Sequence, residues 1–222
     1  MAFPRRIVVL LALLMSVFTA SASDRPAVAV QFRVVAFDGT HLYYHPRPKA
    51  EREEISLHTS APSSTCRYEG PPFLELFRSA AAGPPVVVVP LRPMGPRLLL
   101  VLPPGLAQPD GAGRAPRAAL VIPDDLSAVP VNTVTVLNVT EEPFQLTYDN
   151  RRVELAPMGR GGFPARAVGS LVLSARVGGR WRQVTVHDLE VEENARAWVV
   201  LWPPYRSGQL QPRLRVMFDQ GE

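Results

Sequence analysis

Four histidines and one cysteine are the residues of this chain that could bind a transition metal. His41 and His45, in the stretch HLYYH, would share one face of a strand, but four residues of extended chain separate them by about 13 Å. A blue-copper site needs a histidine, and often a methionine, within a few residues of its cysteine, and the CRYEGPPF stretch that starts at Cys66 contains neither. We therefore expect no metal site, and we predict that Cys66 is a small buried apolar residue.

The acidic and nucleophilic residues form no recognisable catalytic pattern. The sequence contains no Gly-x-Ser-x-Gly, no phosphate-binding loop and no His-Glu-x-x-His. Asp124 and Asp125 are adjacent, and neighbours on a strand point to opposite faces, so they cannot share acid–base chemistry. We expect them to end a strand. The sequence thus predicts a protein that is not an enzyme, with no catalytic residues and no cofactor.

Aromatic side chains are the remaining candidates for ligand contact. Trp181 would face Arg176 across a hairpin, and a guanidinium over an exposed indole contributes ~0.5–1 kcal/mol. Tyr205 follows the strand RAWVVLWPP and falls in the next loop. We predict Trp181, Arg176 and Tyr205 as the possible ligand contacts.

The elements that would position these residues are strands. Val, Leu, Ile, Phe and Tyr occur in short runs broken by turn residues, and 24 Pro spread along the chain exclude long helices. Asp149-Asn150 suits the two-residue turn of a hairpin. Pairing outward from this turn sets Leu146 opposite Val153 on an apolar face, and Thr147 opposite Arg152 on a polar one. We predict an all-β fold.

A second predicted hairpin centres on Gly178-Gly179. Uninterrupted pairing outward from two such glycines fixes the register of both strands. It predicts four pairs: Arg176 with Trp181, Ser174 with Gln183, Leu173 with Val184, and Leu171 with Val186.

The chain also contains an internal repeat. Residues 55–78 align without a gap with residues 153–176, and LLLVLPP, ending at Pro104, aligns with WVVLWPP, ending at Pro204. Each copy offers about seven strands in some 90–100 residues, which is typical of an immunoglobulin-like sandwich. We therefore predict two tandem immunoglobulin-like β-sandwich domains, residues 23–127 and 128–222.

The same alignment bears on two further tryptophans. Trp198 and Trp202 share one face of their strand, where a row of aromatic residues could bind sugar or pack in a core. The first copy has Leu98 and Leu102 at the aligned positions, which favours packing.

Two segments could separate the predicted domains. The boundary falls in Asp124–Pro130 if the repeat is correct. The Gly-, Pro- and Ala-rich stretch Pro103–Arg117 is then a loop between the last two strands of the first domain, although its composition also suits a domain linker.

The N-terminus resembles a secretory signal. Arg5 and Arg6 precede an apolar run that ends at Phe18, and the small residues Ala20-Ser21-Ala22 follow. The run is shorter than the roughly 20 residues that span a bilayer. We predict that residues 1–22 are a signal peptide cleaved after Ala22, that no stable membrane span remains, and that the protein is secreted or periplasmic.

Removal of this segment lowers the net charge. The whole chain has 24 Lys and Arg against 20 Asp and Glu, and residues 1–22 hold two Arg and no acid, so the mature chain would carry a net charge of +2. Such a small excess, without basic clusters interleaved with aromatics, indicates no nucleic-acid partner.

Two resemblances bear on function. The stretch NVTEEPFQLTYDNRRVELAPMG, residues 138–159, resembles uncharacterised secreted bacterial β-proteins, in which a strand ends in Asn and Leu-Ala-Pro precedes a glycine turn; the resemblance implies no known activity. Two immunoglobulin-like domains behind a signal peptide are also similar to the plan of periplasmic pilus chaperones.

We therefore predict an exported, non-enzymatic binding or structural protein that acts through sheet edges or loops on an envelope or extracellular partner. A periplasmic chaperone-like assembly factor and a carbohydrate-binding module are the alternatives.

Overall fold

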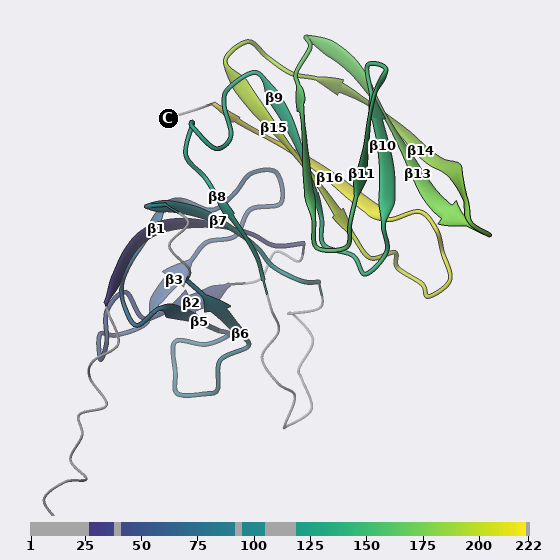
Figure 1. Ribbon diagram of the computed structural model, residues 1–222. Helices are drawn as coiled ribbons and strands as arrows, with labels where there is room; N and C mark the ends of the chain where they lie inside the picture. Colours follow the sequence, from purple (N-terminus) through teal and green to yellow (C-terminus); the bar gives the residue numbers. More distant parts are fainter. Residues whose placement is uncertain (1–26, 38–40, 92–94, 105–118, 221–222) are drawn as a thin grey trace, which may run out of the picture.

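The computed structural model describes residues 27–37, 41–91, 95–104 and 119–220 (Figure 1). All regular secondary structure in these residues is strand, arranged as four sheets of four strands, so the predicted all-β fold is confirmed. The predicted signal peptide lies outside the described residues. Within them, no helix has the length and apolar character needed to cross a bilayer.

The first eight strands form two sheets, which we call the N-terminal half. Sheet A has the order β4-β1-β7-β8, and sheet B has the order β3-β2-β5-β6. The strands are β1 (Val28–Val35), β2 (Leu42–Tyr44), β3 (Glu53–Ile55), β4 (Cys66–Gly70), β5 (Phe73–Phe77), β6 (Val87–Pro90), β7 (Arg97–Val101) and β8 (Leu120–Pro123).

The last eight strands repeat this arrangement in the C-terminal half. Sheet C has the order β12-β9-β15-β16, and sheet D has the order β11-β10-β13-β14. In both halves the first strand runs parallel to the seventh, β1 to β7 and β9 to β15. The strands are β9 (Thr133–Asn138), β10 (Phe144–Tyr148), β11 (Arg151–Leu155), β12 (Arg160–Pro164), β13 (Val168–Val177), β14 (Arg180–Glu190), β15 (Ala195–Trp202) and β16 (Arg213–Gln220).

The connections between strands locate the passage from one half to the other. β7 and β8 pair antiparallel within sheet A, so the stretch Pro103–Arg117 connects two strands of one sheet rather than the two halves. The halves are joined by residues 124–132, between β8 and β9. Asp125 stabilises this passage, because its side chain accepts hydrogen bonds from the backbone N–H of Ser127 at 3.0 Å and of Ala128 at 2.9 Å.

The β10–β11 hairpin has the predicted register. Leu146 pairs with Val153, and Thr147 pairs with Arg152. Asp149 and Asn150 have φ values of 47° and 64°, the left-handed region that a tight two-residue hairpin turn requires. The local sequence therefore determines this hairpin.

The β13–β14 hairpin follows its prediction only near the turn. Arg176 pairs with Trp181, and Ser174 with Gln183, as predicted. Beyond them the predicted register is wrong, because a β-bulge adds one residue to β14: Leu173 pairs with Thr185, and Leu171 with His187.

The bulge changes which residues of β14 face the core. Leu189 and, just after the strand, Val191 are buried, whereas Val186 is 46% exposed. An uninterrupted alternation would have placed Val186 inside. The extra residue therefore moves Val186 out of the core and brings Leu189 and Val191 into it.

The four sheets stack in the order B, A, C, D, and three apolar cores separate them (Figure 1). The first core fills the space between sheets A and B, and the second core fills the space between sheets C and D. The middle core joins the outer faces of sheets A and C. Its buried members are Val35, Leu99, Val101, Ile122, Val129, Leu137, Val139, Trp198, Val200, Trp202 and Met217.

Trp198 and Trp202 are fully buried, so the prediction that they pack is confirmed. They lie in the middle core, however, whereas Leu98 and Leu102 lie in the first core. The repeat alignment is therefore displaced by one residue in these strands. Leu98 pairs with a core residue of β1, and Ala197 pairs with a core residue of β9, which makes Ala197 the structural counterpart of Leu98.

Asn138, the last residue of β9, holds the start of the C-terminal half together. Its fully buried side chain donates hydrogen bonds to the carbonyl oxygens of Glu142 at 2.8 Å and of Ala156 at 3.0 Å. Its oxygen accepts hydrogen bonds from the backbone N–H and the hydroxyl of Thr140. Gly159 closes the following turn by donating to Ala156 O at 3.1 Å, and a Cβ on Gly159 would lie 2.8 Å from that oxygen. Asn138 and Gly159 thus have a structural role in this stretch.

We expect Asn138→Ala to lower the free energy of unfolding by about 2–4 kcal/mol, because it removes four hydrogen bonds of a fully buried side chain and leaves the buried backbone N–H of Thr140 without its acceptor. Urea unfolding followed by tryptophan fluorescence measures the change. Gln209→Ala, at an exposed loop position, is the control. A loss no greater than that of the control would contradict the structural role of Asn138.

Candidate functional site

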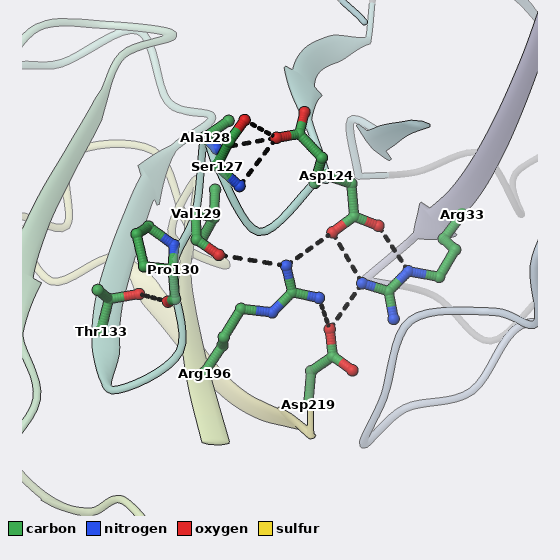
Figure 2. Close-up of polar contacts among 10 residues, drawn as sticks. Arg33, Asp124, Ser127, Ala128, Val129, Pro130, Thr133, Arg196 and Asp219 are labelled. Carbon is green, nitrogen blue, oxygen red and sulfur yellow. Dashed lines mark hydrogen bonds and ion pairs between the residues drawn. The ribbon is translucent and has the colours of Figure 1, made fainter. Parts of the chain in front are cut away.

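A group of four largely buried charges lies at the contact between the two halves (Figure 2). Arg33 of β1 and Arg196 of β15 alternate with core residues, so both point from their sheets toward the opposite half. Asp124 follows β8, and Asp219 is near the end of β16. All four share a sheet face with members of the middle core, and we call them the interface ion cluster.

Each carboxylate of the interface ion cluster contacts both guanidinium groups. Arg33 donates from Nε and Nη2 to the two oxygens of Asp124, at 2.7 and 2.8 Å. The same Nη2 lies 2.7 Å from Asp219 Oδ2, which also accepts a hydrogen bond from Arg196 Nη2. Arg196 Nη1 lies 3.4 Å from Asp124 Oδ1. Two positive and two negative charges therefore compensate one another across the two halves.

Burial and pairing oppose each other in the titration of Asp219 and Arg33. Burial by itself would raise the pKa of Asp219, but the hydrogen bonds and charges of Arg33 and Arg196 hold that pKa below its usual value. Burial likewise opposes the charge of Arg33, yet Asp124 and Asp219 raise its pKa. Pairing therefore favours the charged forms of Asp219 and Arg33 despite their partial burial.

The cluster is suited to joining the halves rather than to acid–base chemistry. The side chains of Arg196 and Asp124 are 4% and 5% exposed, and a cavity of about 40 Å³ beside them has room for a single water molecule. Arg196 Nε is buried without a hydrogen-bond partner among the described residues. Both carboxylates are already occupied by guanidinium groups.

The opposite margin of the same contact is aromatic. Arg215 of β16 donates hydrogen bonds of 2.8 Å to the carbonyl oxygens of Ala36 and Phe37, and Trp202 Nε1 donates to Leu102 O at 3.2 Å. The guanidinium of Arg215 lies 4.8 Å from the ring centre of Phe37. Polar atoms at this margin are thus satisfied by the other half.

The structure places the three predicted ligand contacts in two different regions. Arg176 and Trp181 face each other beside the β13–β14 turn, with the guanidinium carbon 6.0 Å from the ring centre. Tyr205 is 78% exposed and contacts Phe37 and Arg213 at the aromatic margin of the contact between the halves.

The histidines and the cysteine lie apart from the interface ion cluster. His41 Nδ1 is 2.5 Å from Glu54 Oε1, and His45 Nδ1 is 2.7 Å from the carbonyl oxygen of Ala50. Cys66 is buried in the first core, as predicted, and burial together with the charge of Glu53 raises the pKa of its thiol to about 11. In the described ranges, no group of three or more His, Cys, Asp or Glu could hold a metal ion.

A groove of about 860 Å³ lies in the C-terminal half, between the end of β14 and the end of β16. We call it the β14–β16 groove. Its floor is apolar and consists of Leu189, Val191, Ala195, Val216 and Phe218. Its rim carries four exposed acidic residues: Asp188, Glu190, Glu192 and Glu193.

The groove exists because the two sheets do not close at this side. β14 and β16 are the end strands of sheets D and C, and neither pairs with the other. Leu214 and Val216 pack against the second core, and Phe218 lies on the same face of β16, yet it remains 47% exposed. An apolar side chain that faces a sandwich interior is therefore accessible from outside.

Sequence reasoning missed both the interface ion cluster and the groove. Arg33 and Arg196 are single cations within apolar strands, and a charge in such a position needs a buried partner. The acidic run HDLEVEEN, residues 187–194, was the available signal for the groove rim.

A larger open groove, of about 1000 Å³, lies in the N-terminal half beside β4. Its lining carries both charge signs: Arg47, Arg67 and Arg97 together with Glu53, Glu54 and Glu69. It therefore indicates no single class of ligand.

No protein-family model matches this chain, and no curated protein is significantly similar to it.

We expect Asp219→Asn to lower the free energy of unfolding at neutral pH by about 3 kcal/mol, because it leaves two buried guanidinium groups with one carboxylate. In the wild type, the folded-state pKa of Asp219 is below its unfolded value of 3.8, so its contribution is fully present above that value and is lost as the pH falls through the folded-state pKa.

Urea unfolding at neutral pH and near pH 3 measures both effects, with Asp188→Asn as an exposed control. The acid-induced loss of stability should be smaller in Asp219→Asn than in the wild type. An equal acid-induced loss in both proteins would contradict the role of the cluster.

Proposed function

We propose that this chain is an exported, non-enzymatic binding protein that holds an extended segment of an envelope or extracellular partner in the β14–β16 groove. The observation that supports this proposal is the accessible end strand β16, with Phe218 facing the open side of the sandwich. An end strand presents backbone donors and acceptors that another chain can pair with.

The groove combines the two elements of strand addition. The backbone of β16 can form a ladder with an added strand, and the apolar floor can receive every second side chain of that strand. Val216 and Phe218 are two residues apart, which matches the spacing of side chains on one face of a strand.

The interface ion cluster holds the binding strand in place. Asp219, next to Phe218, is bound by Arg33 of the N-terminal half and by Arg196 of the neighbouring strand. A binding strand that is fixed before the partner arrives loses less conformational entropy on association. This explains why both halves would be needed, although the groove lies in one of them.

Export and immunoglobulin-like architecture belong to the same proposal. The cationic and apolar segment at residues 1–22 supports a cleaved signal peptide and a secreted or periplasmic location. Two four-stranded sheets around one core in each half support two immunoglobulin-like domains, with the boundary near residue 127. A chaperone-like assembly factor would use the same strand edge on an aggregation-prone subunit.

A carbohydrate-binding module is the second candidate function, and the contact between Arg176 and Trp181 supports it. We expect any glycan-array signal to disappear in Trp181→Ala and to persist in Arg182→Ala, an exposed neighbour on the same strand. A signal that is unaffected by Trp181→Ala would contradict this candidate.

Site-specific photo-crosslinking tests the proposed binding site. A photoreactive side chain at position 218, introduced in the cells that make the protein, should crosslink to a discrete partner, whereas the same group at the exposed position 154 of β11 should not.

Phe218→Lys should abolish the partner complex, because it places a charge on the apolar floor, and Phe218→Leu should preserve it. Both variants should keep the unfolding midpoint near that of the wild type, since the side chain is half-exposed. Equal crosslinking at positions 218 and 154 would contradict the proposal.

A further inference from the structure

The charges around the β14–β16 groove identify the chemistry of its ligand, provided that the groove is the binding site proposed above. We infer that it binds an extended, amphipathic and cationic segment of a partner protein, in which Lys or Arg alternates with apolar residues. The acidic rim, the apolar floor and the unpaired end strands together carry this inference.

The rim has one charge sign only. Asp188, Glu190, Glu192 and Glu193 are exposed, and the described residues that line the groove include no Lys or Arg. No hydrogen bond or ion pair of these four carboxylates is found within the described residues, whereas Asp219 at the inner end is neutralised by Arg33 and Arg196. The local negative charge contrasts with the net charge of +4 of the whole chain. A cationic ligand would relieve the repulsion among these carboxylates.

A chelated metal ion is a poorer occupant than a polypeptide. The described residues contain no group of three or more acidic or histidine side chains close enough to hold an ion. The rim carboxylates are instead distributed along the end of β14 and the turn before β15. Charges spread along a groove match an extended ligand that carries several separated cations.

The alternation of the ligand follows from the geometry of strand addition. Successive side chains of an added strand point to opposite faces, so one set reaches the floor formed by Leu189, Val216 and Phe218. Asp188 and Glu190 flank the buried Leu189 and therefore lie on the outer face of sheet D. When the added strand pairs with β14, its other set lies on that same face, where the long side chains of Lys and Arg can reach these carboxylates. The apolar set supplies burial, and the cationic set supplies selectivity by charge.

Binding of two short capped peptides tests the inference. In one peptide Lys alternates with Val, and in the other Glu replaces every Lys. Fluorescence anisotropy with the whole mature protein should give at least about a tenfold lower Kd for the Lys peptide at low salt, since each exposed contact contributes modestly and several act together. The difference should shrink as salt is added.

Matched variants test whether the charge acts at the groove. Glu190→Gln combined with Glu193→Gln should weaken binding of the Lys peptide several-fold. Glu141→Gln combined with Glu154→Gln removes the same charge from exposed positions outside the groove lining and should leave the Kd unchanged. Equal weakening by both pairs would show a general effect of net charge and would overturn the inference.

Two further outcomes separate this inference from the proposed function. If both peptides bind with equal affinity and Phe218→Lys abolishes both, the groove binds strands without regard to charge, and only the inference fails. If neither peptide binds and position 218 gives no crosslink, the proposed function fails as well. If the protein forms dimers that Phe218→Lys dissociates, a second copy occupies the groove, and the inference is overturned.

Discussion

The burial of the outer faces of sheets A and C against each other is the constraint on which the rest of this structure depends. A sheet in a sandwich usually has one face in the core and one face in solvent. Here every residue of β15 is buried, because its alternate residues enter the second core and the middle core. Full burial of one large apolar side chain stabilises a fold by about 1.5–3 kcal/mol. Trp198 and Trp202 make the middle core the largest concentration of indole surface in the described residues.

This contact determines where charged residues can be tolerated. Polar groups on the joined faces lose water and must find partners in the opposite half. Arg33, Asp124, Arg196 and Asp219 form such a set at one margin, and the backbone contacts of Arg215 form another. The ion cluster thus follows from the apolar contact, since four charges of this kind would be solvated if the halves were apart.

The same constraint leaves few places for a ligand. The middle core covers much of the outer faces of sheets A and C, and most of the exposed residues of these two sheets lie in the end strands β4, β12 and β16. β16 is fixed on one face by Asp219 and by Met217 in the middle core, while Phe218 on the other face lines the groove. One strand therefore connects the contact between the halves with the proposed binding site. A ligand on β16 would act directly on a strand that both halves hold in place.

The sequence by itself determined the features that depend on short-range geometry. The alternation of apolar residues predicted an all-β fold, and Asp149-Asn150 fixed both the turn and the register of β10–β11, because the two residues accept positive φ values. The repeat was visible as well, since the same strand order requires similar runs and turns. Buried Cys66 and the packed Trp198 and Trp202 also followed from residue type.

Only the tertiary structure decided the features that join distant segments. Arg33 binds Asp219, which is 186 residues away in the sequence. The period-two alternation shows which residues share a face of one strand, but it does not show which other sheet packs against that face. The bulge in β14 shifted the register of that strand without a glycine or proline to mark it. The groove lies between the end strands β14 and β16, which do not pair with each other. The local sequence of a strand does not show that it lacks a neighbour on one side. Local geometry specified the strands. The packing of sheet A against sheet C then determined where buried charges are paired and which end strands stay accessible.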